Sequence, residues 1–483
     1  MPCRHRLALD ASMLQRRQWA PTIVERTPTP EGTLTTTPID PRPPLHPLAV
    51  DGGSDEHLRG DPIGGERYFS PEFMQREWDH MWTKVWHIAG RVNQLQHVGD
   101  YVVHDFMHES VMVVKQADGS LRAFYNVCGH RGQRLVWGEG QQASFHCPYH
   151  GWEWGNDGVL KVAPDSEDFP QGDPCGKVKL VELPVDTWAG FVWYTMDPDA
   201  PSLMEFLHPW PQLYRNHASA EMTRIVWMTV ELETNWKFAP DNFSESYHTR
   251  TAHPQVAQFI DMDYYTSRQE LYENGHNRIM QLWRPSLRDR VPEGEPHRFH
   301  DELRKWGIDP DQYPDYETMV TQGWLDIVAA KRELGPSKGH HHYSRLSEED
   351  FLYSPHDQLF PNVSLDIRPD NVSMFRTEPH RTDPNKCTFD LQCFAMPIEG
   401  QEEARCIAGM RPLKEAEFEH RVFDGGDGLP EMAGSVIFQD MALAEGQQRG
   451  QRSRGYQEPY LAGQESRMRA WHETLNDYLA GRR

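Results

Sequence analysis

The chain has 483 residues, and this length predicts more than one domain because a single hydrophobic core stops growing at roughly 250–300 residues. The composition, with 38% hydrophobic and 25% charged residues, is that of an ordinary globular protein. A net charge of −23 repels nucleic-acid phosphates and anionic lipids, so neither is an expected partner. No apolar run reaches membrane-spanning length, and no signal-peptide-like stretch precedes Pro21, so we expect a cytoplasmic protein without a membrane span.

The cysteines are few and odd in number, which argues against a disulfide framework. They are more consistent with buried small residues or metal ligands, and their spacing decides between these interpretations. The seven positions are Cys3, Cys128, Cys147, Cys175, Cys387, Cys393 and Cys406.

The N-terminal segment differs in composition from the rest of the chain. Residues 1–66 are rich in Pro, Thr and Arg and have no sustained apolar period, which predicts a disordered or extended arm. At residues 67–84 the pattern changes: Ser70 is a good N-cap and a proline follows at the first helical position. Apolar side chains then recur at helical spacing, which predicts an amphipathic helix; they are Phe73, Trp78, Met81 and Trp82.

Two further regions follow. Residues 85–200 contain short β-like runs separated by turns, with a hairpin expected at Asp118-Gly119 and a second turn at 156–158. We expect a small all-β domain there. Residues 201–483 mix alternating strands, such as the one beginning at Thr223, with helical segments near residues 301–307, 316–334 and 465–479. This mixture predicts an α+β domain with an antiparallel sheet.

The first chemical constellation is Cys128-x-His130 followed, after sixteen intervening residues, by Cys147-x-x-His150. Two cysteines and two histidines in paired loops predict a four-ligand metal site, either zinc or an iron–sulfur cluster of mixed ligation. Each loop supplies one ligand of each type, an arrangement that suits a [2Fe-2S] centre with thiolates on one iron and imidazoles on the other.

The second constellation comprises Glu245, His248 and His253. Glu245 and His248 are three residues apart and are expected on one helix face. His253 is five residues beyond His248, which on a regular helix turns it roughly 140° away. Both imidazoles can meet one metal only if the helix is distorted or ends between them, and Pro254 is consistent with an end. Two histidines and a carboxylate are the preferred ligands of mononuclear Fe(II) with open positions.

Together the two constellations carry a family resemblance. "CGHRG", "CPYHGW" and "NWKFAPDNFSESYHTRTAHP" resemble the cluster loops and iron-binding stretch of the catalytic (alpha) subunits of Rieske non-haem iron oxygenases, the aromatic ring-hydroxylating dioxygenase-like family. The resemblance covers about Ser70 to the C-terminus. It implies a Rieske [2Fe-2S] domain followed by a helix-grip (START-like) antiparallel-sheet catalytic domain. The implied cofactors are one [2Fe-2S] cluster, on Cys128, His130, Cys147 and His150, and one mononuclear Fe(II), on His248 and His253.

The resemblance also implies roles for further carboxylates. "VIFQDMALAEGQQRG" resembles the family's late helix and makes Asp440 the third iron ligand, with Glu445 as a competitor. Glu245 occupies the position that bridges the first histidine ligand to a cluster histidine, here His150, of a neighbouring subunit. It is one methylene longer than the aspartate common in ring-hydroxylating relatives. Asp241 and Asn242 are interpreted as supporting or structural residues.

The function implied is hydroxylation of an aromatic or other hydrophobic small molecule with O2. No Gly-rich dinucleotide fingerprint follows a strand, so electrons are expected from a separate NAD(P)H-dependent reductase, with or without a ferredoxin. The resemblance implies a homotrimer in which one subunit's cluster serves the next subunit's iron, with or without small β subunits.

Two alternatives stay open. One is a monooxygenase or demethylase of a quaternary ammonium compound. The other is a non-catalytic iron–sulfur electron carrier or a zinc-stabilised binding protein. The histidine run at residues 340–342 is interpreted as a solvent-side loop, because no carboxylate or cysteine keeps a ligand-like spacing beside it.

Overall fold

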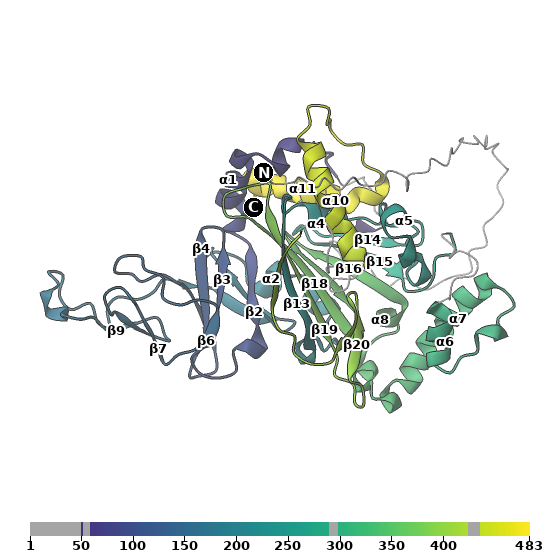
Figure 1. Cartoon of the computed structure of the whole chain (residues 1–483), viewed down its shortest axis with the longest axis horizontal. Coiled ribbons are helices and arrows are strands. Elements are labelled where there is room, and N and C mark those ends of the chain that lie inside the picture. Colours follow the sequence, from purple (N-terminus) through teal and green to yellow (C-terminus); the bar gives the residue numbers. More distant parts are fainter. Residues whose placement is uncertain (1–49, 52–57, 289–297, 424–434) are drawn as a thin grey trace, which may run out of the picture. The chain divides into compact units, whose positions relative to one another are not determined.

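The computed structural model describes residues 50–51, 58–288, 298–423 and 435–483 (Figure 1). Most of the predicted N-terminal arm therefore lies outside the described residues. The six cysteines within them are free thiols, and Cys3 lies outside. Within the same residues, no helix combines the length and the apolar content that crossing a membrane requires.

The predicted N-terminal helix is confirmed. Ser70 Oγ accepts a hydrogen bond from the Phe73 amide at 3.1 Å and caps α1 (Pro71–Glu77), which continues as the π-helix η4 (Trp78–Trp82). The segment just before it is packed against the end of the chain: the Gly60 amide donates to Glu473 Oε1 at 2.8 Å in α11 (Ser466–Leu479). The segment around Gly60 thus lies beside α11.

The predicted all-β domain consists of three small sheets. The largest has the order β10-β5-β4-β3-β6, and the predicted hairpin joins β4 (Glu109–Lys115) to β5 (Leu121–Tyr125) through Gly119 at φ +87°. The predicted turn at 156–158 joins β8, which ends at Gly155, to β9, which begins at Leu160. The remaining strands are β2 (Trp86–Arg91), β3 (Asp100–Phe106), β6 (Glu139–Gln141), β7 (Ser144–His146), β8 (Glu153–Gly155), β9 (Leu160–Val162), β10 (Glu182–Leu183), β11 (Val185–Trp188) and β12 (Phe191–Thr195).

The second domain is built on a nine-stranded sheet, which confirms the predicted α+β class. Its order is β1-β14-β15-β16-β17-β18-β19-β13-β22, antiparallel except for the parallel pair of β13 and β22. The strands are β1 (Val50–Asp51), β13 (Thr223–Leu232), β14 (Arg268–Leu271), β15 (Asn277–Leu282), β16 (Tyr353–Leu359), β17 (Val363–Ile367), β18 (Asn371–Pro379), β19 (Cys387–Ala395) and β22 (Glu419–Val422).

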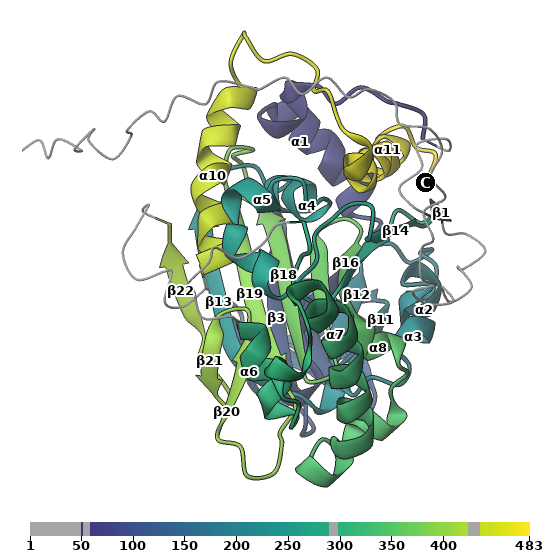
Figure 2. The ribbon, with the colours of Figure 1, turned by 90° about the vertical axis from the view of Figure 1, so that its right-hand side faces the viewer.

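Helices and the all-β domain cover opposite faces of this sheet. On one face lie α4 (Phe238–Phe243), α5 (Thr249–Ala252) and α10 (Ser435–Gln451) (Figure 2). Ser244 Oγ, just after α4, donates to Gln358 Oε1 of β16 at 2.9 Å. On the other face Arg376 of β18 donates to the Ile88 carbonyl of β2 at 2.8 Å. The central strands β16 to β19 are therefore largely buried on both faces, whereas the edge strand β22 is exposed.

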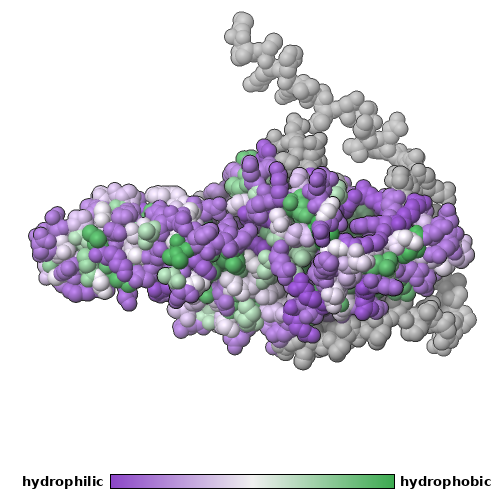
Figure 3. Space-filling view, turned by 90° about the horizontal axis from the view of Figure 1, so that it is seen from below, coloured by the Kyte–Doolittle hydropathy of each residue, from purple (hydrophilic) through white to green (hydrophobic). Residues whose placement is uncertain are grey.

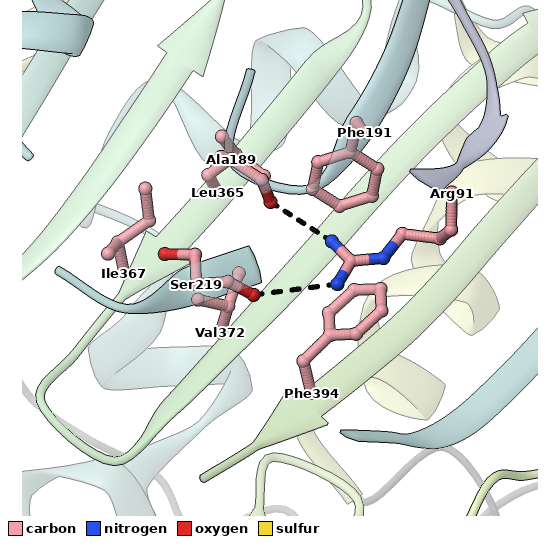
Figure 4. Close-up of a pocket in the computed structure, with 8 residues that line it drawn as sticks. All are labelled: Arg91, Ala189, Phe191, Ser219, Leu365, Ile367, Val372 and Phe394. Carbon is pink, nitrogen blue, oxygen red and sulfur yellow. Dashed lines mark hydrogen bonds between the residues drawn. The ribbon is translucent and has the colours of Figure 1, made fainter. Parts of the chain in front are cut away.

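A buried arginine helps to join the two domains. The Arg91 guanidinium lies between the rings of Phe191 and Phe394, at 4.7 and 4.4 Å from their centroids, and donates to the carbonyls of Ala189 and Ser219 (Figure 4). Burial lowers the pKa of Arg91 to about 10, so the side chain stays charged at neutral pH and retains its cation–π attraction.

Three further helices were predicted from the sequence. The predicted helices at 301–307 and 316–334 are α6 (Arg298–Lys305) and α7 (Tyr316–Leu334), and the predicted C-terminal helix is α11. Seen from below, the surface is predominantly hydrophilic, with apolar residues in small separate groups (Figure 3). This surface is in keeping with the strong net negative charge of the chain.

Protonation of a buried histidine is predicted to destabilise the fold in acid. His276 is fully buried; its Nε2–H donates to the Phe206 carbonyl at 2.7 Å and its Nδ1 accepts from the Phe360 amide at 2.8 Å. Burial lowers its pKa to about 3. Between this value and about 6.5 the unfolded chain binds a proton that the native protein does not. The free energy of unfolding should therefore fall with falling pH, by about 1.4 kcal/mol per unit for this group.

The substitution His276→Gln tests this. A glutamine amide can donate to Phe206 and accept from Phe360, yet it does not titrate. In urea unfolding between about pH 6.5 and 4, the variant should lose less stability than the wild type as the pH falls. Parallel pH profiles for the two proteins would contradict the assignment.

Candidate metal centres

Two loops of the all-β domain share one backbone pattern. The Gly132 amide donates to the Cys128 carbonyl at 3.0 Å, and the Gly151 amide donates to the Cys147 carbonyl at 3.1 Å. Both glycines have positive φ, +74° and +71°, which L side chains rarely adopt. Each loop therefore folds back on itself and turns its cysteine and histidine in the same direction.

The four predicted cluster residues come together at the ends of these loops. The rings of His130 and His150 lie 4.6 Å apart, and Trp152 stacks on His130 at 4.7 Å. Cys128 and Cys147 are buried, and burial raises the pKa of the Cys128 thiol. The neighbouring His146 belongs to β7, is exposed, and has its Nε2 3.2 Å from Ser144 Oγ.

The ring nitrogens indicate what this group can hold. Nδ1 of His130 and Nδ1 of His150 are buried, and neither has a hydrogen-bond partner in the described part of the chain. Burial and the neighbouring imidazole of His150 lower the pKa of His130, which favours the neutral, ligating form. Two buried thiols and two unpartnered imidazole nitrogens fit a [2Fe-2S] cluster with mixed ligation.

The second histidine pair flanks a short helix that ends before His253, and an end between the two histidines was one of the two possibilities predicted from the spacing. His248 is the N-cap of α5, and the helix ends at Ala252; His253 leaves it at φ −131° and ψ 53°. The two imidazoles consequently face each other, with ring centroids 5.2 Å apart. One prediction was wrong in detail: Glu245 and His248 lie in the turn between α4 and α5 and share no helix face, yet the turn still brings them into contact.

Helix α10 brings Asp440 to this pair. Asp440 Oδ1 lies 2.8 Å from His253 Nε2 and 3.7 Å from His248 Nε2, and the three ligand atoms all lie within 4.8 Å of one another. Glu445, the competing carboxylate, is not a member of this group. The group His248, His253 and Asp440 is hereafter the triad.

Neighbouring acceptors fix the orientation of both imidazoles. His248 Nδ1 donates to Glu245 Oε1 at 2.6 Å, and His253 Nδ1 donates to Gln439 Oε1 at 2.7 Å. With each Nδ1 directed at an acceptor, each Nε2 is directed toward Asp440. Sequence reasoning missed Gln439, and no residue pattern near Asp440 points to it. The triad therefore fits a mononuclear metal ion with two imidazoles and one carboxylate.

The electrostatics of the triad favour a bound cation. Burial alone would lower the pKa of His253, but the hydrogen bond and negative charge of Asp440 raise it above its ordinary value. Asn242 completes the surroundings: its Nδ2 lies 3.2 Å from Asp440 Oδ1 and 3.4 Å from His248 Nε2. This contact agrees with the supporting role predicted for Asn242.

Comparison with known families identifies both domains. The family model described as "Ring hydroxylating alpha subunit (catalytic domain)" matches residues 219–481, more than half of the chain. The chain belongs to this family. The model "Rieske [2Fe-2S] domain" matches residues 85–180, which contain all four predicted cluster residues. The Rieske oxygenase resemblance of the sequence is thereby confirmed, with its [2Fe-2S] and mononuclear iron cofactors.

Several oxygenases are similar to this alpha subunit. The carnitine monooxygenase oxygenase subunit of Escherichia coli (strain K12) is 32% identical over 207 residues, which are 41% of this chain and 54% of the relative. The chloroplastic choline monooxygenase of Spinacia oleracea is 30% identical over 213 residues, 43% of this chain and 48% of the relative. The matched segment thus spans about half the length of these curated relatives.

Solved structures show the same fold. A quaternary ammonium Rieske monooxygenase superposes with a TM-score of 0.60 at 19% identity, over 86% of this chain and 95% of that one. Naphthalene 1,2-dioxygenase from Rhodococcus sp. bound to indole superposes with a TM-score of 0.58 at 17% identity, over 87% and 94%. At these identities the likeness establishes the shared fold alone.

In this alpha subunit a buried carboxylate anchors α4, the helix that precedes the triad histidines. Asp241 accepts hydrogen bonds from the Tyr68 hydroxyl at 2.7 Å and from His472 Nε2 at 2.9 Å. Burial lowers the pKa of His472 to about 4, so its imidazole is neutral, and its Nδ1 accepts from Arg67 at 2.7 Å. The segment before α1 and the C-terminal helix thus fix the position of α4 through these hydrogen bonds.

We predict that Tyr68→Phe destabilises the protein. The variant removes one donor from the buried Asp241 carboxylate, which costs about 1–3 kcal/mol. Urea unfolding should show this loss, whereas Tyr460→Phe, at a fully exposed tyrosine, should leave the midpoint unchanged. Equal midpoints for the two variants would show that the Asp241 anchor contributes nothing.

Proposed function

We propose that this chain is an oxygenase component that uses O2, and electrons from a separate reductase, to hydroxylate an aromatic or other hydrophobic small molecule. The observation that carries the proposal is the triad, in a chain that also contains a Rieske domain. A bound cluster would store single electrons, and a bound Fe(II) with open positions would activate oxygen. A protein that only carries electrons needs the cluster but does not need a second metal site such as the triad.

We assign the cluster to Cys128, His130, Cys147 and His150, and the mononuclear iron to the triad. In this assignment the protein's part is to hold and orient. Glu245 and Gln439 keep a proton on each Nδ1, so that each Nε2 is free to ligate. Asn242 donates to Asp440 and keeps its carboxylate turned toward the imidazoles. We further propose the domain limits 85–200 and 201–483.

Glu245 is proposed to connect the two kinds of site between subunits. Its side chain accepts from His248 Nδ1 and from the His248 amide, and the neighbouring Tyr247 is exposed, so this turn lies at the surface. At the cluster, His130 and His150 are both only partly buried. In a head-to-tail ring, His150 of the partner subunit would donate to Glu245, giving the electron a short path to His248.

The assembly and the electron donor follow from this path. We propose a homotrimer, with or without β subunits, reduced by a separate NAD(P)H-dependent reductase with or without a ferredoxin. The published description of the similar quaternary ammonium Rieske monooxygenase names inter-subunit electron transfer for that protein. The same arrangement here would make each site depend on two subunits.

Aromatic side chains beside α4 support an apolar or aromatic substrate. Phe243 lies 5.0 Å from Phe375 of β18, and Phe375 lies 6.2 Å from Phe389 of β19. A quaternary ammonium substrate is the second candidate, because the carnitine and choline monooxygenases are similar to this chain. Aromatic faces also attract such cations.

Oxygen uptake tests the function and separates the candidates. The purified protein is reduced through a reductase and supplied in turn with aromatic acids, polycyclic hydrocarbons and quaternary amines. Substrate-dependent oxygen consumption with formation of a hydroxylated product supports the proposal, and the active class identifies the substrate. A protein that cycles electrons but consumes no oxygen with any class would be an electron carrier.

We predict that Asp440→Ala removes mononuclear iron and leaves the cluster. The variant should show the visible spectrum of an intact Rieske centre, with turnover reduced by more than about 100-fold, because even residues behind the ligands commonly cost about 10–100-fold. Iron analysis and visible spectroscopy provide the measurement. Glu445→Ala, a carboxylate of the same helix outside the triad, is the control and should keep its iron. Loss of mononuclear iron in Glu445→Ala but not in Asp440→Ala would show that Glu445 is the ligand.

We predict that Glu245→Gln uncouples the two sites. The cluster should still be reduced by dithionite, but its reoxidation by O2 in the presence of substrate should slow by about 10–100-fold, the equivalent of one charged hydrogen bond of about 1.5–3 kcal/mol. Stopped-flow absorbance measures this rate. Glu245→Asp retains the carboxylate and should recover part of it. Wild-type reoxidation in the glutamine variant would rule out this electron path.

A further inference from the structure

A second group of metal-ligating side chains lies outside the sites described above. The histidine run at 340–342 was predicted to be a solvent-side loop, and this was wrong for two of its three members: His340 and His342 are buried, and only His341 is exposed. The fold brings to them Asp370, a carboxylate distant in the sequence. Among the described residues, two sets of three such side chains have all their ligand atoms within 4.8 Å of one another: this set and the triad.

We propose that His340, His342 and Asp370 bind a zinc ion. His340 Nδ1 and His342 Nε2 each lie 3.0 Å from Asp370 Oδ1, and all three ligand atoms lie within 4.8 Å of one another. Two imidazole nitrogens from the start of η11 and one carboxylate oxygen from the β17–β18 connection thus lie close together. This proposal is independent of the proposed function.

The supports of the three ligands are rigid. Asp370 lies in the tight connection between β17 and β18, where the Arg368 amide donates to the Asn371 carbonyl at 2.9 Å and the Met396 amide donates to the Asp370 carbonyl at 2.8 Å. The hydroxyl of Tyr343 donates to Asp370 Oδ2, so that Oδ1 remains turned toward the histidines. This is the outer hydrogen bond that orients a ligating carboxylate.

The histidines are held as firmly. They flank the start of the 3-10 helix η11 (His341–Arg345), and the ring of Tyr343 stacks on His340 with centroids 4.6 Å apart. Trp306, after α6, lies 6.0 Å from the same imidazole. Packing therefore limits the rotamers of the ligands before any ion binds, which reduces the entropic cost of binding.

The chemistry of the group suits zinc, as the same ligand types suit Fe(II) in the triad. Nitrogen and oxygen ligands of borderline softness suit Zn²⁺, whereas Mg²⁺ and Ca²⁺ prefer oxygen alone. The Asp370 side chain is 36% exposed while those of His340 and His342 are 6% and 5% exposed, so the carboxylate side is open to a water as fourth ligand. A bound ion would fasten the helical segment that contains α7 and η11 to the edge of the β17–β18 hairpin.

Metal analysis of the full-length holoenzyme tests the proposal. The protein is incubated with zinc sulfate, freed of loosely bound zinc by gel filtration, and analysed for zinc and iron. We expect about one firmly held zinc per subunit. Asp370→Ala and His342→Ala should lower this zinc at least about tenfold, and His341→Ala, the exposed neighbour, should keep it.

Two further variants make the outcome decisive. Zinc that has entered the iron site should disappear in Asp440→Ala, whereas zinc at the proposed site should remain. His342→Gln and Asp370→Asn preserve side-chain size, and an unchanged Rieske absorbance shows that each variant is folded. Zinc absent from the wild type, or retained in Asp370→Ala and lost in Asp440→Ala, would overturn the proposal and leave the three residues as a hydrogen-bonded anchor.

Discussion

The active region depends on how α4 is fixed in the protein interior. At its start, Lys237 donates to the fully buried Glu77 of α1 at 2.6 Å, and Trp236 donates to the same carboxylate at 3.2 Å. Burial raises the pKa of Glu77 and lowers that of Lys237, which reflects the cost of taking both charges out of water. Farther along α4, the Asp241 carboxylate accepts hydrogen bonds from Tyr68 and His472. Polar groups from residues 68–77 and from α11 thus set the position of α4, which precedes the triad histidines.

This anchoring explains why the triad can be assembled from weak local structure. α5 has only four residues and begins and ends at the two histidines, so local helix stability contributes little. Positional accuracy comes from outside: α4 is anchored in the interior, Gln439 holds His253, and Gln448 of α10 accepts from the Asn235 amide at 3.0 Å. The two Rieske loops are stabilised locally instead, because each is closed by a backbone hydrogen bond within the loop.

Much of the fold could be predicted because its signals are local. The N-cap at Ser70 and the Asp118-Gly119 turn each specify an element within a few residues, and both are present. The four residues assigned to the cluster could also be predicted from the sequence, because two short spacings contain all of them. The third triad residue needed the family resemblance, because Asp440 is far from the histidines in the sequence. Gln439 and the Asp370 partner of the histidine run were not predictable in this way.

The sequence by itself determined which ligand types are available and that a helix carrying His248 and His253 must be distorted or end between them. Through the family resemblance it also indicated that a Rieske domain precedes a sheet domain. Only the tertiary structure decided which carboxylate meets which histidines. Asp440 rather than Glu445 reaches one pair, and Asp370 reaches the other, because strand register and helix packing place them there. The physical reason is that a ligand set forms at a point in space, while sequence spacing constrains only residues within the same local element.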